Sequence, residues 1–486
     1  MRIIESSDWQ PEGRVVAWAA APAMTAAVEA APDDPTPPSF LQRDHILSCA
    51  AARAAGGTHR AYTASIATVN APLDTARMTA VVDAFIASHE GLRSVFSTDG
   101  ESVRRRTLGP DDVAMAPTVI FDPAGDAAGT AGDAAGDATG DPATGTAGDP
   151  APATAAEAID ALLPRHAVFD HVPGCALVAV DRGDSFELLY ALDHAFGDGI
   201  SQVTGILELL ARYAGADVPP LTDDEHPGFL GYVREEYARA AAVTDDSPGV
   251  RLWGELFDRV GGTPQFPLDT GIVDGEPQWV GGLFCDPAPA DLDQVAALRR
   301  LAAQRGVSFS TVVYALMALA ERRTAGTSEY ATVVVSATRG ERYPVSQGWF
   351  CNFSPLFFEM TGDTVEDILD AVSAAQHRMK EALPDPVHAC VGRLIEQGRV
   401  DASVMASPQL VTYIDLSWFR EPGDHDIRLF TGLGKTRNAS FWLFRDEDGL
   451  TLGCQAPDNP TAVASLERYF TALREIVAET AARYPA

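Results

Sequence analysis

The stretch that decides the fold is His194-Ala195-Phe196-Gly197-Asp198-Gly199, which directly follows an apolar run at residues 186–192. The apolar run predicts a buried strand, so the hexapeptide places an imidazole where that strand ends. A general base needs such a place, open to a cleft and with an acid nearby that holds the loop. An ordinary Asp-Gly turn after a strand has the same letters, so the hexapeptide alone does not establish catalysis.

Length and composition set the scale of the molecule. A chain of 486 residues is too long for one compact core and predicts two domains of roughly 200 residues each. We place the boundary before a helix and a Gly/Pro-rich connector at residues 248–268, which gives domains at residues 1–240 and 241–486. Helices and β-branched strands alternate in both parts, which predicts an α/β protein.

The charge argues against several classes of partner. A formal net charge of -32 disfavours nucleic acid and anionic membranes, because phosphate contacts need basic patches. The first residues lack the pattern of a signal peptide, and no apolar run reaches about 18 residues. We therefore expect a cytoplasmic protein without a transmembrane segment.

The sequence does not contain the motifs of several other enzyme classes with the spacing that those classes require. Six cysteines are scattered without a Cys-x-x-Cys pair or a histidine cluster, which predicts neither a metal site nor a redox site. The segment 432–436 ends like a phosphate-binding loop, but Leu429 stands where that loop requires glycine. A Gly-x-Ser-x-Gly elbow, which a serine hydrolase of the α/β type needs, is missing from the sequence.

One stretch breaks the globular pattern. Residues 122–157 consist almost entirely of Ala, Gly, Asp, Thr and Pro, which predicts a disordered acidic insertion. The flanking segments predict strands and helices of a single sheet, including a helix at 158–163 and a strand at 175–180. The insertion is therefore expected to interrupt the N-terminal domain rather than to separate two domains.

Several weaker motifs share one order along the chain, and together they resemble the condensation-domain superfamily of thioester-dependent acyltransferases. Among its members, the chain is most similar to stand-alone polyketide-associated acyltransferases. The motifs that carry the likeness are the polar helix end at 88–96, the HxxxDG hexapeptide, the Trp-containing segment 252–257, Gly261-Gly262 before Phe266-Pro267-Leu268, Arg339-Gly340, the Gly-x-Phe-x-Asn segment 348–352, and Tyr413-Ile414-Asp415.

The resemblance implies a fold and an activity. The fold would be two α/β subdomains of the chloramphenicol-acetyltransferase type, arranged in a V with a tunnel and the active site at their junction. The activity would be acyl transfer from coenzyme A or an acyl carrier protein to an alcohol or sugar, in lipid, glycolipid or polyketide biosynthesis. The thioester would be a co-substrate, with no permanently bound cofactor, and we expect a monomer.

The resemblance also implies roles for particular residues. His194 would act as general base, which suits an imidazole with an ordinary pKa near 6.5. Asp198 would form a structural ion pair with Arg339 or Arg93, of which we favour Arg339, and Gly199 would give the backbone freedom and leave the tunnel clear. Two further polar residues, Asn352 and Asp193, are expected to line the tunnel. For Asn352, a loop asparagine that bonds only the backbone is an equally good interpretation.

Two other functions stay open from the sequence. Peptide-forming condensation domains usually carry two adjacent histidines, and this chain has Asp193 in the first place. That departure favours an ester product, although an amide-forming enzyme is a close alternative. The second alternative is a non-catalytic relative that serves as a docking platform, which has no need of His194, Asp198 and Gly199 together.

Overall fold

The computed structural model describes residues 1–58, 60–124, 152–218, 221, 227–273, 275–419, 423, 425–432 and 434–485. The chain divides into two compact units. Unit 1 comprises Met1–Glu235, Arg339–Phe350 and Phe419–Gly432, and unit 2 comprises Glu236–Thr338, Cys351–Trp418 and Leu433–Ala486. The first change of unit lies five residues before the predicted boundary at 240, and two later segments return to unit 1, which the sequence does not predict.

Most of the predicted insertion lies outside the described residues, since 125–151 are not described. At its C-terminal edge, the prediction of disorder is wrong for residues 155–157. These residues form the first turn of α4 (Ala155–His166), because the Thr154 side chain accepts a hydrogen bond from the Glu157 backbone N–H and caps the helix.

Unit 1 is built around a seven-stranded sheet with the order β1-β14-β3-β8-β7-β2-β6, and β4 and β5 form a separate pair. Its strands are β1 (Arg2–Ile3), β2 (Arg14–Ala20), β3 (Tyr62–Val69), β4 (Ser94–Thr98), β5 (Val103–Thr107), β6 (Met115–Phe121), β7 (Cys175–Asp181), β8 (Phe186–Asp193) and β14 (Arg428–Thr431). Its helices are α1 (Pro22–Ala30), α2 (Phe40–Ala54), α3 (Thr75–Ser88), α4 and α5 (Gly199–Tyr213), and α6 (Phe229–Ala242) starts in it.

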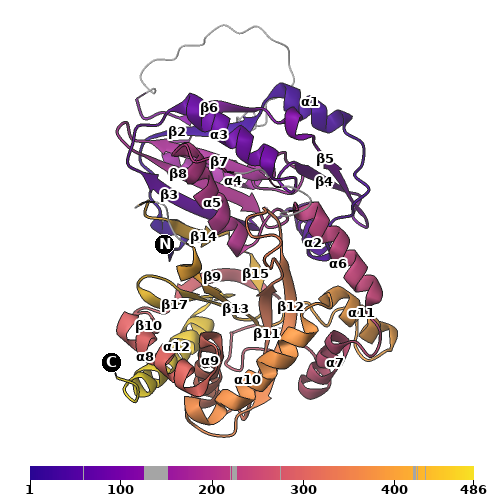
Figure 1. Cartoon of the computed structure of the whole chain (residues 1–486), viewed down its shortest axis with the longest axis vertical. Coiled ribbons are helices and arrows are strands. Elements are labelled where there is room, and N and C mark those ends of the chain that lie inside the picture. Colours follow the sequence, from indigo (N-terminus) through magenta and orange to yellow (C-terminus); the bar gives the residue numbers. More distant parts are fainter. Residues whose placement is uncertain are drawn as a thin grey trace. The chain divides into compact units, whose positions relative to one another are not determined.

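The central strand of unit 1 is β8, whose eight residues are all buried. It pairs antiparallel with β3 and with β7, and helices cover both faces of the sheet. The helix α4 packs on one face through Ile159, Leu162 and Leu163. The helices α3 and α5 pack on the other face, in front of the strands in Figure 1. The sheet therefore holds the end of β8 rigidly.

The strand β14 explains why segment 419–432 joins unit 1. It pairs antiparallel with β3 and in parallel with β1, so a late part of the chain completes the sheet that starts the chain. Gln202 of α5 donates a hydrogen bond of 3.2 Å to the Phe430 carbonyl and another to the Ala64 carbonyl, which ties α5 to both strands.

Unit 2 contains an eight-stranded sheet with the order β12-β11-β13-β16-β17-β9-β15, and β10 pairs with β17. Its strands are β9 (Gln278–Phe284), β10 (Ala290–Asp291), β11 (Glu329–Ala337), β12 (Cys351–Glu359), β13 (Leu410–Asp415), β15 (Lys435–Thr436), β16 (Ser440–Arg445) and β17 (Gly449–Pro457). Its helices are α7 (Pro248–Val260), α8 (Leu292–Arg305), α9 (Phe309–Ala325), α10 (Val365–Ala382), α11 (Val387–Glu396) and α12 (Pro460–Ala481).

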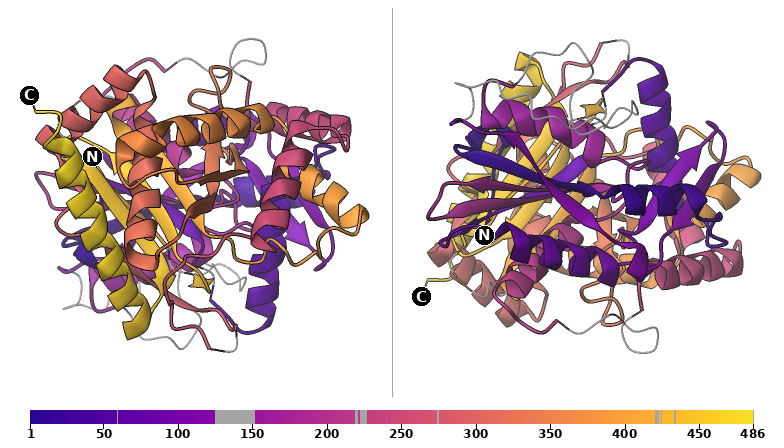
Figure 2. Two further views of the ribbon diagram at one scale, coloured as in Figure 1. Left: turned by 90° about the horizontal axis from the view of Figure 1, so that it is seen from below. Right: turned by 90° about the horizontal axis from the view of Figure 1, so that it is seen from above.

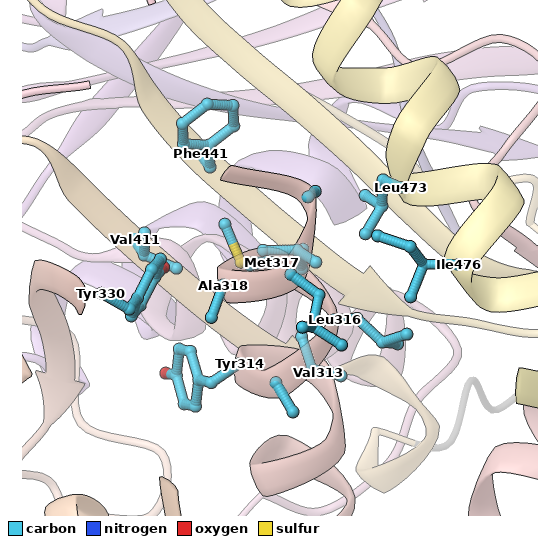
Figure 3. Packing of buried hydrophobic residues seen from close by; sticks show 14 of the residues in the cluster. Val313, Tyr314, Leu316, Met317, Ala318, Tyr330, Val411, Phe441, Leu473 and Ile476 are labelled. Carbon is cyan, nitrogen blue, oxygen red and sulfur yellow. The ribbon is translucent and has the colours of Figure 1, made fainter. Parts of the chain in front are cut away.

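The core of unit 2 surrounds α9, whose residues 311–321 are all buried. Figure 3 shows α9 between Tyr330 and Val411 of the sheet on one side and Leu473 and Ile476 of α12 on the other. Figure 2 shows α12, in yellow, beside α8 and α9. The helices α7 and α11 pack on the opposite face of the sheet, so unit 2 is also a layered α/β structure.

Within the described ranges, none of the helices combines the length and the apolar character needed to cross a lipid bilayer.

Candidate active site

The predicted catalytic turn connects β8 to α5. The strand ends at Asp193, and α5 begins at Gly199 with Asp198 as its N-cap, where Oδ1 accepts the Ser201 backbone N–H at 2.7 Å. The His194 N–H donates to the Ala61 carbonyl at 3.1 Å, which fixes the start of the turn. His194 is half-buried whereas its neighbours on both sides are buried, so the turn presents the imidazole.

The glycine that the turn requires is Gly197. A Cβ atom there would lie 2.0 Å from Leu192 Cδ1 and 3.0 Å from Ser201 Cβ, so a side chain does not fit. The expected conformational freedom at Gly199 is not observed. Gly199 is the first helical residue of α5 and is not among the described glycines with a positive φ angle.

Asp198 is anchored by Arg339 and not by Arg93. Arg339 Nη2 lies 3.0 Å from Asp198 Oδ1, and the two side chains are only 5% and 4% exposed. The other carboxylate oxygen accepts the Phe350 N–H at 3.0 Å. Arg93 instead donates to the Leu108 carbonyl. Asp198 is therefore a structural residue whose carboxylate holds the start of α5.

Arg339 holds the loop 339–350 in place within unit 1. Its guanidinium donates to the carbonyls of Tyr343, at 3.1 Å, and Ser346, and to the Ser201 hydroxyl at 2.8 Å. It also lies 4.2 Å above the centre of the Phe350 ring, a cation–π contact. These bonds place residue 349 beside the catalytic turn.

Trp349 stacks on His194. The ring centroids are 4.0 Å apart with an interplanar angle of 32°, and the indole is half-buried. The contact limits the rotation of the imidazole. Trp349 was not predicted as a site residue, although it stands in the segment 348–352 that carries the family resemblance.

A second histidine, His45 of α2, lies close to this pair of rings. Its Nε2 lies 2.9 Å from Asp193 Oδ1, and its ring centroid is 5.7 Å from Trp349 and 6.2 Å from His194. The sequence does not reveal His45, because it stands in a helix without a recognisable motif and reaches the site only through the packing of α2 in unit 1.

Asp193 does not line a cavity, so that prediction is wrong. Its side chain is completely buried, and Oδ1 also accepts the Ala195 N–H at 2.7 Å. The carboxylate is therefore directed away from solvent, toward His45 and the backbone on the far side of His194.

The two histidines differ in their proton affinity. Burial alone would lower the pKa of His45, but the charge of Asp193 and its hydrogen bond raise that pKa to about 10. Burial and the positive charge of His45 lower the pKa of His194. At neutral pH, His45 is consequently an imidazolium and His194 a neutral imidazole, which is the state a general base needs.

Asn352 lies in unit 2 and has a structural role, so the prediction that it lines a tunnel is not supported. Its amide nitrogen donates to the carbonyls of Leu383, at 2.9 Å, and Asp385, at 2.8 Å. Its oxygen accepts the N–H groups of Phe353 and Val387, each at 3.0 Å. The side chain joins the start of β12 to the loop before α11 and has no polar capacity left for a substrate.

Among the described residues, no group of three or more His, Cys, Asp and Glu side chains could hold a metal ion. His166 and His171 stack on each other at 4.5 Å, and burial lowers the pKa of both.

The arrangement of sheets and helices in this chain is the condensation-domain fold, as the comparison with solved structures shows. A solved structure titled "PapA2 acyl transferase" matches with a TM-score of 0.81 at 20% identity, over 99% of this chain and 100% of that one. The first condensation domain of the calcium-dependent antibiotic synthetase matches with a TM-score of 0.63 at 20% identity, over 91% and 96%. The predicted α/β fold of the condensation-domain type is confirmed, whereas the V shape, the tunnel and an active site at a junction stay predictions.

The curated proteins that this chain resembles in sequence are Pap-type acyltransferases. They include trehalose-2-sulfate acyltransferase PapA2 of Mycobacterium bovis (strain BCG / Pasteur 1173P2), 24% identical over 98% of this chain and 96% of that protein. They also include 2'-acyl-2-O-sulfo-trehalose (hydroxy)phthioceranyltransferase PapA1 of Mycobacterium tuberculosis (strain CDC 1551 / Oshkosh), 23% identical over 96% and 86%. Acyltransferase PapA3 of the same strain is 22% identical over 96% and 94%. No family model matches the chain. The homologues confirm the predicted relationship and the predicted enzyme class, an acyltransferase.

Proposed function

We propose that the chain transfers an acyl group from a thioester to a sugar hydroxyl and forms an ester, with His194 as general base. The observation that carries the proposal is the placement of His194: a half-buried imidazole that contacts Trp349 at the end of the buried strand β8, where burial and His45 lower its pKa. The donor would be an acyl-coenzyme A or an acyl carrier protein. Action in the cytoplasm and a monomeric state stay predictions.

The reaction follows from the chemistry of the base. Because Nδ1 of His194 is buried, we place proton transfer at Nε2. Nε2 takes the proton of the acceptor hydroxyl while the oxygen attacks the thioester carbonyl carbon. The tetrahedral intermediate then expels the thiolate, which takes the proton back from the imidazolium. Ester and free thiol are the products, and His194 is restored. Such a base contributes about 100- to 10,000-fold to the rate.

The acceptor class rests on the homologues. PapA2 is named for trehalose 2-sulfate and PapA1 for an acylated sulfo-trehalose, so both act on sugar acceptors. We therefore infer a sugar hydroxyl for this chain. An amine acceptor would instead give an amide, as in peptide-forming condensation domains.

The test is thiol release from a panel of acyl-coenzyme A donors and acylated carrier protein, with trehalose, trehalose 2-sulfate or an amine as acceptor. We expect acceptor-dependent thiol release and a sugar ester by mass spectrometry. His194→Ala should abolish both, whereas His377→Ala, which changes an exposed histidine of unit 2, should abolish neither. An amide product would contradict the ester, and full activity of His194→Ala would contradict the base.

A further inference from the structure

We propose that the buried pair of His45 and Asp193 is a positioning unit that controls the protonation of His194 by balancing a positive against a negative charge beside it. The inference rests on the proposed role of His194 as base. His45 and Asp193 would touch neither donor nor acceptor, so both act through His194.

The pair of His45 and Asp193 is connected to the backbone both before and after His194. The His45 side chain is 11% exposed and that of Asp193 is fully buried, with 2.9 Å between Nε2 and Oδ1. Asp193 directly precedes His194, and the same Oδ1 accepts the N–H of Ala195, which directly follows it. The backbone that carries His194 is therefore held from both sides by one carboxylate.

The charges of the pair act on His194 in opposite directions. The imidazolium of His45, with its ring centroid 6.2 Å away, disfavours a second positive charge on His194. The carboxylate of Asp193 favours that charge. Burial disfavours that charge as well, so the imidazolium of His45 and burial together keep His194 neutral, and loss of the His45 charge weakens this effect.

Among the described residues, Asp198 and Cys49 also act on the two histidines. Asp198, at the start of α5, favours the protonated form of His194, but it is paired with Arg339 of the loop 339–350. On α2, the Cys49 sulfur lies 3.6 Å from His45 Nε2 and raises the pKa of His45. Removing the charge of His45 or of Asp193 therefore changes the electric field at His194 more directly than a change at Asp198 or Cys49 would.

A second histidine–carboxylate pair lies in the same unit and serves as the control. His89 Nε2 lies 2.9 Å from Glu208 Oε2, with side chains 1% and 8% exposed. It connects the end of α3 to α5, as His45 connects α2 to β8. If buried histidine–carboxylate pairs only hold elements together, then substitutions at His45 and at His89 have the same consequences.

The experiment removes the charge but keeps the hydrogen bond. His45→Gln retains a donor for Asp193 and leaves its negative charge uncompensated beside His194. We expect the apparent pKa of His194 to rise by about one unit, which lowers kcat/KM about tenfold on the acidic side and leaves the alkaline plateau nearly unchanged. Adding Asp193→Asn to His45→Gln should reverse most of this rise. His89→Gln should leave the pKa of His194 unchanged.

The direct readout is the titration of His194 by NMR on histidine labelled with carbon-13, with the signal assigned by its loss in His194→Ala. This readout does not depend on acyl transfer. A raised pKa of His194 in His45→Gln therefore supports the inference even if every donor fails, an outcome that would overturn only the proposed function. An unchanged pKa in a folded His45→Gln protein overturns the inference.

The variant that combines His45→Gln with Asp193→Asn provides a second test if His45→Gln alone does not fold. With both charges removed, the pKa of His194 should stay within about half a unit of the wild-type value. A shift of more than about one unit in the double variant would contradict the balance of charges. A pH profile of kcat/KM for the same proteins separates this effect from a loss of substrate binding, which would appear in KM alone.

Discussion

At the residue scale, the site depends on one ion pair that is fully removed from solvent. Asp198 and Arg339 are almost completely buried, and the carboxylate also receives the backbone N–H groups of Ser201 and Phe350. A buried pair of this kind contributes less by its own attraction than its loss costs, because a single remaining charge has no partner in the interior. The pair therefore makes the turn and the loop 339–350 interdependent.

Arg339→Met is expected to lower the free energy of unfolding by about 3–5 kcal/mol, because it leaves Asp198 buried without a counter-charge. Urea denaturation followed by circular dichroism measures the change. Arg14→Met is the control, since the pair of Arg14 and Asp181 has the same kind of contact at 2.9 Å but a 40% exposed arginine. It should cost about 0–1 kcal/mol. Equal losses for the two variants would contradict the importance of the buried pair.

At the element scale, close packing around Gly197 restricts the conformation of the turn between β8 and α5. Gly197 passes so close to Leu192 that even one additional carbon atom collides. The N-cap of α5 and the hydrogen bond of the His194 N–H to Ala61 hold the two ends of the turn. A change in the turn should therefore move the imidazole and not only reduce stability.

Gly197→Ala is expected to destabilise the protein by about 1–3 kcal/mol, because the new methyl group displaces Leu192 or the turn. It should also reduce acyl transfer by more than the loss of folded protein explains. Gly392→Ala is a matched control in a helix of unit 2, where a Cβ atom meets no atom within 4 Å. That variant should be neutral or slightly stabilising. Thermal denaturation and thiol release at one temperature test both.

Periodicity predicts most of these elements, since each depends on neighbouring residues. The predicted strands at 175–180 and 186–192 correspond to β7 and β8, and the predicted helix at 158–163 lies within α4. Contacts between segments that are far apart in the sequence cannot be predicted in this way. Nothing near His45 indicates that α2 places it against Asp193, and nothing in segment 419–432 indicates that β14 joins the sheet of unit 1.

At the scale of the whole molecule, the two units have separate cores, and the core of unit 2 contains an acid. Glu321 on α9 is buried, and burial raises its pKa to about 8, while Gln409 donates a hydrogen bond to it at 3.1 Å. The folded state thus holds a proton that the unfolded chain releases near pH 4.5. The stability linked to this proton is complete below that pH and is lost as the pH rises toward about 8.

Glu321→Gln should remove this dependence, because glutamine keeps the acceptor oxygen and carries no proton to lose. We expect the melting temperature of the wild-type protein to fall more between about pH 5 and pH 8 than that of the variant. Calorimetry at several pH values measures the difference. Parallel decreases in the two proteins would show that Glu321 does not control the stability of unit 2.

The central claim is that neutral His194 is the base of an acyltransferase. The most direct test is the pH dependence of kcat/KM for ester formation, from about pH 5 to pH 9, in the wild-type protein and in His194→Ala. Because the pKa of His194 is lowered, the wild-type profile should rise through one acidic limb with an apparent pKa below 6.5 and then reach a plateau. In His194→Ala, the plateau should fall about 100- to 10,000-fold and this limb should disappear. A variant that keeps both the plateau and the limb would contradict the account.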